Sequence, residues 1–189
     1  MATKIGIIAE DDSDVDVIKE ILGKYLPQES FSTKKFVGKG CGKLRAKCAA
    51  WTSSLSIQGC EHILIFHDLD RYNETTLRKE LSEKINATGV INTLIVIPIE
   101  ELESWLLSDV DAIKDIFSIR ANVKPITNVE QVKSPKEHLQ KLVKKLANKP
   151  YINSIHNKKI ASKIALKNLM NCSSFKPLND YISNQIAKS

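Results

Sequence analysis

Long apolar runs are missing from this sequence of 189 residues. No stretch approaches the roughly 20 consecutive apolar residues that a membrane-spanning helix requires. The first residues also lack the basic head, apolar segment and cleavage site of a secretory signal, because a strand-like run from Lys4 to Ala9 begins almost at once. We therefore expect a cytoplasmic protein with no membrane partner.

Cysteine is scarce, and its spacing indicates no metal site. The four cysteines include no C-x-x-C pair, and no pair of histidines accompanies them at the spacing of a zinc finger, so structural zinc is not predicted. We interpret them as reduced, buried or half-buried thiols: Cys41, Cys48, Cys60 and Cys172.

The spacing of a nucleotide-binding P-loop is also absent. The glycine-rich stretch Gly38–Lys43 is the nearest approach, but it lacks the GxxxxGK[ST] pattern. Its lysines, Lys39 and Lys43, are candidates for contacting a nucleic-acid backbone, and a plain flexible turn is an equal alternative. The sequence therefore carries no nucleotide-binding motif of its own.

Basic residues are in excess, with 28 Lys and Arg against 22 Asp and Glu and a net charge of +6. Lysines concentrate in the stretches 34–47 and 133–167, whereas acidic residues gather around a few predicted strand ends. Metal-assisted phosphodiester chemistry needs this combination, because carboxylates hold the metal and basic flanks hold the phosphates. The charge pattern favours a DNA or RNA partner.

Short apolar runs rich in β-branched residues indicate a parallel sheet. Near-continuous runs of this kind are typical of strands that are buried on both faces: Lys4–Ala9, His62–Phe66 and Asn92–Ile97. Phe31–Val37 is predicted as a further strand near the sheet edge. Helical periodicity lies between the runs, at Val15–Leu22, Leu44–Leu55 and Thr75–Asn86. The alternation predicts an α/β fold with helices flanking the sheet.

The second half of the chain is predicted to be helical. Ser134 and Pro135 mark a helix start as its cap and first turn. The other predicted helices are Glu100–Asp109, Asp111–Phe117, Lys158–Met170 and Leu178–Ala187. We predict a metal-binding domain over residues 1–108 and a helical extension over 109–189 that packs on it.

All three clear strands run into acidic residues, at Glu10–Asp14, Asp68–Asp70 and Glu100–Glu103. Ligands of parallel α/β sheets bind beyond the carboxyl ends of the strands. Each group taken alone is typical of a helix cap, but three acidic strand ends in one small sheet favour a metal site. Hard oxygen donors suit Mg²⁺ or Mn²⁺, and the candidate ligands are Glu10, Asp14, Asp68, Asp70, Glu100 and Glu103.

The order of these motifs resembles the Toprim domain of topoisomerases, primases and OLD-type nucleases, which has a glutamate after the first strand and a DxD after a later one. Glu10–Asp14 is similar to the OLD-type E-G-x-[ST]-D pattern, with Asp11 in place of the glycine. Ile97–Leu107 (IPIEELESWLL) resembles more closely a group of small bacterial Toprim-like proteins, the DUF4276 type related to RloB. Phe36–Gly40 and Ser173–Phe175 also resemble that group.

The resemblance implies a Toprim fold and Mg²⁺-dependent nuclease chemistry, often in phage defence beside an ABC- or AAA-type ATPase. It implies two-metal hydrolysis in which Asp68 and Asp70 hold the ions, supported by Asp14 and Glu103. Glu10 would complete the shell or act as general base. OLD-type nucleases also use a late lysine, which Lys159 matches best, followed by its neighbour Lys158. Arg71, directly after the DxD, is a candidate for binding phosphate or for neutralising the carboxylates.

Two other functions remain open at this point. A response-regulator receiver would use Glu10–Asp12 as its acidic pocket and Asp68 or Asp70 as its phosphoacceptor. Against it, no Ser or Thr follows the third strand, and Lys124-Pro125 follows no clear strand. Alternatively, the acids bind a metal only structurally, and the chain is a scaffold or regulatory subunit of a defence complex. The oligomeric state is also open, and a homodimer is compatible with the sequence.

Overall fold

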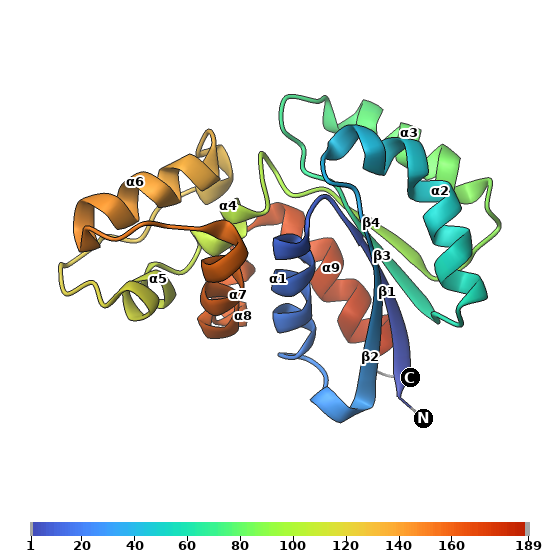
Figure 1. Ribbon diagram of the computed structural model, residues 1–189, viewed down its shortest axis with the longest axis horizontal. Helices are drawn as coiled ribbons and strands as arrows, with labels where there is room; N and C mark the ends of the chain where they lie inside the picture. Colours follow the sequence, from blue (N-terminus) through green and yellow to red (C-terminus); the bar gives the residue numbers. More distant parts are fainter. Residues whose placement is uncertain (1, 188–189) are drawn as a thin grey trace.

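The structure is a computed structural model that describes residues 2–187. Its centre is a sheet of four parallel strands in the order β2-β1-β3-β4 (Figure 1). The strands are β1 (Thr3–Ala9), β2 (Phe31–Val37), β3 (His62–Phe66) and β4 (Thr93–Val96). The predicted α/β class is confirmed, including the edge position of the strand at residues 31–37.

Side chains alternate between the two faces of the sheet and build two hydrophobic clusters. Ile5 and Ile7 of β1 pack toward α1 (Asp12–Leu22), whereas Ile8 packs toward α2 (Cys41–Ile57) and α3 (Glu74–Asn86). Figure 1 shows α1 on one side of the sheet and α2 and α3 on the other. Burial on both faces explains why β1 and β3 are continuous apolar runs in the sequence.

The strand order reverses between β1 and β3. The chain leaves β1 through α1 to reach β2 at the edge, then returns through α2 on the opposite face to reach β3. The register pairs Ile8 with Ile65, so that β1 and β3 end at nearly the same level. The carboxyl ends of these two strands therefore border the crevice where doubly wound sheets bind ligands.

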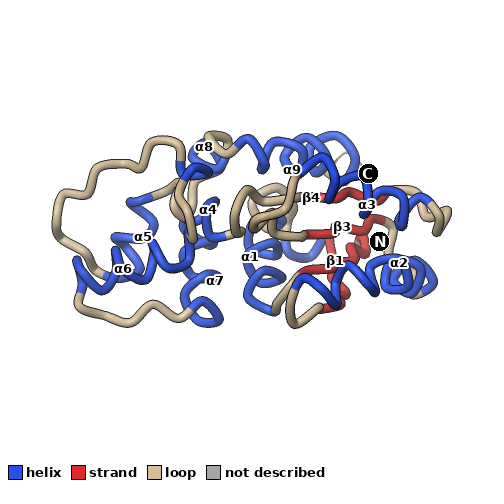
Figure 2. Tube along the Cα trace, turned by 90° about the horizontal axis from the view of Figure 1, so that it is seen from above, coloured by secondary structure: helices blue, strands red, loops and turns tan. Residues whose placement is uncertain are grey.

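Helices and short turns make up the rest of the chain. They are α4 (Glu103–Leu106), α5 (Val110–Phe117), α6 (Pro135–Ala147), α7 (Asn153–Lys163), α8 (Leu166–Leu169), α9 (Lys176–Tyr181), a π-helical turn (Ile182–Ile186) and the 3-10 turns Gln28–Ser30, Val129–Gln131 and Ser173–Phe175. Figure 2 shows α5 to α8 extending beyond α1, whereas α9 returns to the sheet. Within residues 2–187, no helix is both long and apolar enough to cross a bilayer.

One hydrophobic cluster joins the two halves of the chain, since Ile7 of β1, Ile160 of α7 and Phe175 belong to the same buried set. The predicted boundary at residue 108 therefore does not separate two hydrophobic cores. It remains a prediction, and residues 1, 188 and 189 of the two predicted segments lie outside the described part of the chain.

Two predicted helices are shorter than expected. The predicted helix Glu100–Asp109 is wrong in its first turn, because Glu100 has a left-handed backbone (φ 62°) and α4 begins only at Glu103. The predicted helix Lys158–Met170 is wrong as a single element. Ile164 and Ala165 are extended there (ψ 131° and 137°), which separates α7 from α8.

The start of α6 also differs from the prediction. Pro135 occupies the first turn as expected, but Ser134 is left-handed (φ 49°) and its side chain caps nothing. The amide of Lys136 donates instead to Oε2 of Glu101 at 2.9 Å. A carboxylate from the segment after β4 thus takes the place of the predicted cap and stabilises the helix N-terminus.

The tryptophan of the Ile97–Leu107 stretch has a structural role. Trp105 is fully buried and packs edge-to-face on Phe66 and Phe175, with ring centroids 6.2 Å and 5.2 Å away. Its indole N–H donates to Ser174 Oγ at 2.8 Å, and Ser174 is bound by the Glu130 carboxylate. The resemblance at Ser173–Phe175 and at Trp105 therefore reflects one packing unit, which contacts Phe66 at the end of β3.

Candidate metal centre

Glu10 and Asp68 lie where the strand order reverses. Glu10 directly follows β1, and Asp68 comes two residues after β3. Oε1 of Glu10 accepts the amide N–H of Asp68 at 3.1 Å, and Oδ1 of Asp68 accepts the amide of Leu102 at 3.0 Å. Three segments, after β1, β3 and β4, are thereby joined through two carboxylates.

Asp14 reaches the same place from the first turn of α1. The helix is capped by Asp11, whose Oδ1 accepts the amides of Ser13 at 2.7 Å and Asp14 at 3.1 Å. The Asp11 amide N–H in turn donates to Oδ2 of Asp14 at 3.1 Å, which completes a reciprocal capping box. Capping accounts for Asp11 and in part for Asp14, but it accounts for neither Glu10 nor Asp68.

Glu103 enters the site at the start of α4 and is held from α7. Its Oε1 accepts Nδ2 of Asn157 at 3.0 Å, and the same amide lies 3.4 Å from Ser13 Oγ. Tyr151 donates its hydroxyl to Oδ1 of Asn157. Glu103 is 5% exposed and Asn157 is fully buried, so the helical extension contributes a bonded side chain to the acidic site.

Burial and mutual repulsion perturb these four side chains, which we call the carboxylate cluster: Glu10, Asp14, Asp68 and Glu103. Burial raises the pKa of Glu10 to about 7, with the charges of Asp70 and Asp11 adding to the rise. Burial also raises the pKa values of Asp14 and Asp68 well above the usual range, and further increases come from the other members of the cluster. The pKa of Glu103 is raised by burial, an effect that the Asn157 hydrogen bond opposes.

Basic side chains offset this concentration of acid only weakly: Lys136 lowers the pKa of Glu103 without forming an ion pair with it. Within residues 2–187, the cluster forms no ion pair with a Lys or Arg. His67 Nδ1 lies 3.4 Å from Glu10 Oε1 and 2.7 Å from the Asp68 carbonyl oxygen, but burial lowers the histidine pKa and favours its neutral form. Asp14 and Glu103 are buried and Glu10 and Asp68 half-buried. Carboxylates in such surroundings are costly without a paired counter-charge, so the cluster is suited to a bound cation.

The chemistry of the donors fits a hard divalent cation, since every member of the cluster offers carboxylate oxygens. The arrangement is not already closed around one ion. In the described residues, no three or more His, Cys, Asp or Glu side chains are placed to hold a metal ion together. Metal binding would therefore require rotation of at least some of these side chains.

Asp70 and Glu100 do not join the buried cluster. Asp70 is exposed at the rim, with a left-handed backbone (φ 47°), and its charge contributes to raising the pKa values of Glu10 and Asp68. Glu100 accepts the Asp70 amide on its carbonyl at 2.8 Å, while its carboxylate pairs with Lys133. The predicted shared helix face for Glu100 and Glu103 is absent because the chain turns at Glu100.

The predicted basic residues lie on the surface around the site. The Lys39 amide donates to the Glu10 carbonyl at 2.8 Å, and its side chain is exposed. Lys43 is exposed in the first turn of α2, and Arg71 is exposed beside Asp70. On α7, Lys158 lies 3.8 Å from Glu20, and Lys159 is exposed with no ion pair to the cluster.

Asn157, two residues before Lys159, is the side chain of this region that reaches the acids. The sequence carried a signal for it, because Asn157 shares the spacing i, i+3, i+4, i+7 with Ile160, Ala161 and Ile164, all of which are buried. An amide on an apolar helical stripe must find buried partners. Lys158 and Lys159, the next two residues, lie outside that apolar stripe and face solvent.

Replacing Asn157 with alanine is expected to lower the free energy of unfolding by about 1.5–3 kcal/mol, because the buried Glu103 carboxylate loses its side-chain hydrogen-bond donor. Urea denaturation at pH 7.5 measures the change. The exposed Asn171 offers a matched control, and Asn171→Ala should stay within about 0.5 kcal/mol of wild type. Equal stability of Asn157→Ala and wild type would contradict the role assigned to this amide.

Comparisons with known proteins identify one family. Residues 9–182 match the family model described as "Domain of unknown function (DUF4276)". No curated protein matches the chain. No solved structure matches it either.

Proposed function

Since this chain belongs to the DUF4276 family, whose description assigns no function, we propose one from the site itself: a Mg²⁺- or Mn²⁺-dependent nuclease of Toprim type that hydrolyses DNA or RNA phosphodiesters. The observation that carries the proposal is the carboxylate cluster at the crevice between β1 and β3. Four acids from separate segments converge there, and no Lys or Arg in residues 2–187 pairs with them. A phosphodiesterase site needs such an anionic centre with basic surroundings.

Each residue has a defined part in this proposal. Asp68, Asp14 and Glu103 would hold the divalent ions, and Asn157 fixes the orientation of Glu103. When bound, the ions would supply Lewis acidity at the scissile phosphate, by the two-metal route. Glu10, which already accepts the Asp68 amide at 3.1 Å, is placed beside the proposed metal ligands and would accept a proton from the attacking water.

Positive charge for the substrate backbone would come from exposed side chains beside the cluster. Lys39 adjoins Glu10 through its own amide, and Arg71 adjoins Asp70 at the rim. Lys159, which the resemblance to OLD-type nucleases indicates as catalytic, faces solvent on α7. The proposal therefore relies on Lys39 and Arg71 to neutralise phosphate.

The direct test is cleavage of a panel of labelled single- and double-stranded DNA and RNA with Mg²⁺, with Mn²⁺ and with EDTA. We expect metal-dependent cleavage that falls by about 100-fold or more in the Asp68→Ala/Asp70→Ala variant. The exposed pair Asp111 and Asp115 offers a control with the same charge change, and its double alanine variant should cleave like wild type.

Cleavage that resists EDTA, or that survives in a folded Asp68→Ala/Asp70→Ala variant, would overturn the proposal. Absence of cleavage together with tight metal binding in calorimetry would instead favour the second candidate, a metal-binding scaffold or regulatory subunit. The observation that favours this alternative is the open arrangement of the carboxylates. Restoration of cleavage by a partner ATPase would distinguish an incomplete nuclease from a scaffold.

A further inference from the structure

We propose that Tyr72 is a stacking platform for an unpaired base beside the carboxylate cluster, which makes single-stranded nucleic acid the preferred ligand of this site. The inference rests on the proposed nuclease function and names its substrate class. Three observations support it: Tyr72 is exposed, neighbouring side chains fix its ring, and it shares a hollow with Asp70 and Arg71.

Tyr72 is a large aromatic side chain that remains 40% exposed. It lies two residues after Asp70, in the turn that carries the rim of the acidic site. Its position therefore places an exposed π-face next to the carboxylates that are proposed to act on a phosphodiester. Such an aromatic face is the feature by which proteins hold single strands without reading their sequence.

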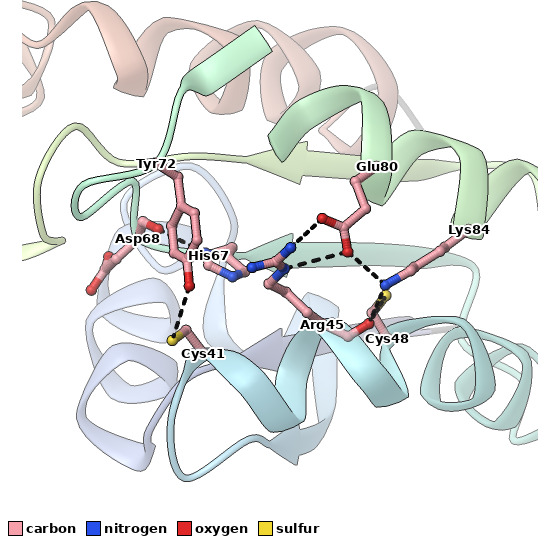
Figure 3. Close-up of polar contacts among 8 residues, drawn as sticks. All are labelled: Cys41, Arg45, Cys48, His67, Asp68, Tyr72, Glu80 and Lys84. Atoms are coloured by element: carbon pink, nitrogen blue, oxygen red, sulfur yellow. Dashed lines mark hydrogen bonds and ion pairs between the residues drawn. The ribbon is translucent and has the colours of Figure 1, made fainter. Parts of the chain in front are cut away.

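The ring of Tyr72 is held in place by a network of charged side chains. The guanidinium carbon of Arg45 lies 4.8 Å from the ring centroid, in a cation–π contact. Arg45 is itself bound by the Glu80 carboxylate, which also accepts Lys84 Nζ at 2.7 Å. Figure 3 shows this series of side chains running from Tyr72 through Arg45 to Lys84.

Two further contacts restrict the ring. His67 meets it edge-to-face with centroids 5.9 Å apart, and the hydroxyl lies 3.9 Å from Cys41 Sγ at the start of α2. In Figure 3, Arg45 and Asp68 are drawn on opposite sides of Tyr72. Because these contacts fix the ring before a ligand arrives, binding costs little conformational entropy, which increases the affinity gained from stacking.

A hollow of about 420 Å³ adjoins the platform. Tyr72, Asp70 and Arg71 line it together with residues from between β4 and α6, which include the acids Glu100 and Glu130 as well as Ile99 and Lys133. This volume is within the range of small-ligand sites. Arg71 forms no ion pair within residues 2–187, so its guanidinium is free to bind a phosphate while an apolar surface at Ile99 accommodates a base or sugar.

Single strands match this combination better than duplexes do. Bases inside a duplex are stacked on their neighbours and cannot present a face to a protein side chain without unstacking. A strand without a complement can place one base on Tyr72 and its phosphates near Arg71. The carboxylate cluster would then lie within the reach of an adjacent phosphodiester.

Fluorescence anisotropy in EDTA, where the proposed metal-dependent cleavage cannot occur, tests the inference. The ligands are single-stranded DNA, single-stranded RNA, the matching DNA duplex and an abasic DNA strand of equal charge. Wild type should bind the base-bearing single strands most tightly. Tyr72→Ala should weaken the binding of these strands by about 5- to 150-fold, to the affinity that wild type has for the abasic strand. The affinity for the abasic strand itself should be the same in Tyr72→Ala and in wild type.

Two further variants separate stacking from other effects of the substitution. Tyr72→Phe should bind like wild type, because the hydroxyl contact with Cys41 is not needed for stacking. Ile57→Ala removes another exposed apolar side chain, 87% exposed at the end of α2, and should leave binding unchanged.

The inference is overturned if Tyr72→Ala binds single strands like wild type, if it loses the same affinity for the abasic strand, or if wild type binds the duplex equally well. Cleavage with Mn²⁺ is scored separately. Base-dependent binding without any cleavage would count against the nuclease proposal and support the role of Tyr72 in stacking. Cleavage by wild type, together with unaltered binding in Tyr72→Ala, would support the nuclease proposal and count against the role of Tyr72.

Discussion

Saturating Mn²⁺ is expected to raise the melting temperature of the wild-type protein by about 5–10 °C, and Asp68→Asn is expected to remove most of that increase. A ligand at 100 times its dissociation constant stabilises the folded state by about 2.7 kcal/mol, and each kcal/mol shifts a chain of this size by about 2–4 °C. Asparagine keeps an oxygen acceptor for the Leu102 amide but removes an ionisable carboxylate from the cluster. Differential scanning fluorimetry with a metal titration measures both effects.

Without metal, the same substitution should act in the opposite direction. Asp68 lies among carboxylates whose charges raise its pKa, so that Asp68→Asn relieves repulsion and should melt above wild type in EDTA. Asp111→Asn changes an exposed aspartate that pairs with Lys114 at 3.3 Å, and it should retain the wild-type metal response. A variant that is both less stable in EDTA and fully responsive to Mn²⁺ would contradict the cation site.

Replacing Glu10 with glutamine is expected to stabilise the metal-free protein by up to about 3 kcal/mol at pH 8 and to have no effect near pH 4.5. The folded state raises the pKa of Glu10 from 4.5 to about 7, and each unit is worth about 1.4 kcal/mol. Folded protein therefore binds the proton more tightly than unfolded protein, so ionisation lowers stability as pH rises through this interval. Glutamine carries no charge and keeps an acceptor for the Asp68 amide.

Urea denaturation in EDTA at several pH values between 4.5 and 8 measures this difference. Groups elsewhere, such as Glu80 with its lowered pKa, titrate equally in both proteins and cancel in the comparison. Glu137→Gln, at an exposed position of α6, is the matched control and should show no pH-dependent difference. If the difference in the free energy of unfolding between Glu10→Gln and wild type stayed constant over this pH range, the raised pKa of Glu10 would be refuted.

The position of the site could be predicted from the sequence because parallel strands place their carboxyl ends at one edge. Glu10 and Asp68 meet through a hydrogen bond as a consequence of that rule alone. Asp14 followed from helical geometry, although the sequence did not show that Asp11, the residue in place of the usual glycine, would provide the cap. Local periodicity was sufficient to predict the position of a side chain wherever that side chain belonged to a helix or a strand.

Prediction failed where the chain leaves regular structure. Glu100 has a left-handed conformation that is uncommon for a non-glycine residue, and its carboxylate pairs with Lys133. The partners of Asn157 could not be predicted for a different reason: Glu103 and Ser13 are 54 and 144 residues away in sequence. No local pattern encodes which distant carboxylate a buried amide will meet.

The contact between Asn157 and Ser13 also has a consequence for biosynthesis. The residues that hold the acids are separated by nearly the whole chain, 144 positions apart, and long-range closures of this kind form late in folding. A nascent chain on the ribosome would display Glu10, Asp14 and Asp68 long before α7 has been translated. Glu103 acquires its amide partner only once α7 is made, so a complete acidic centre arises only after α7 has been translated.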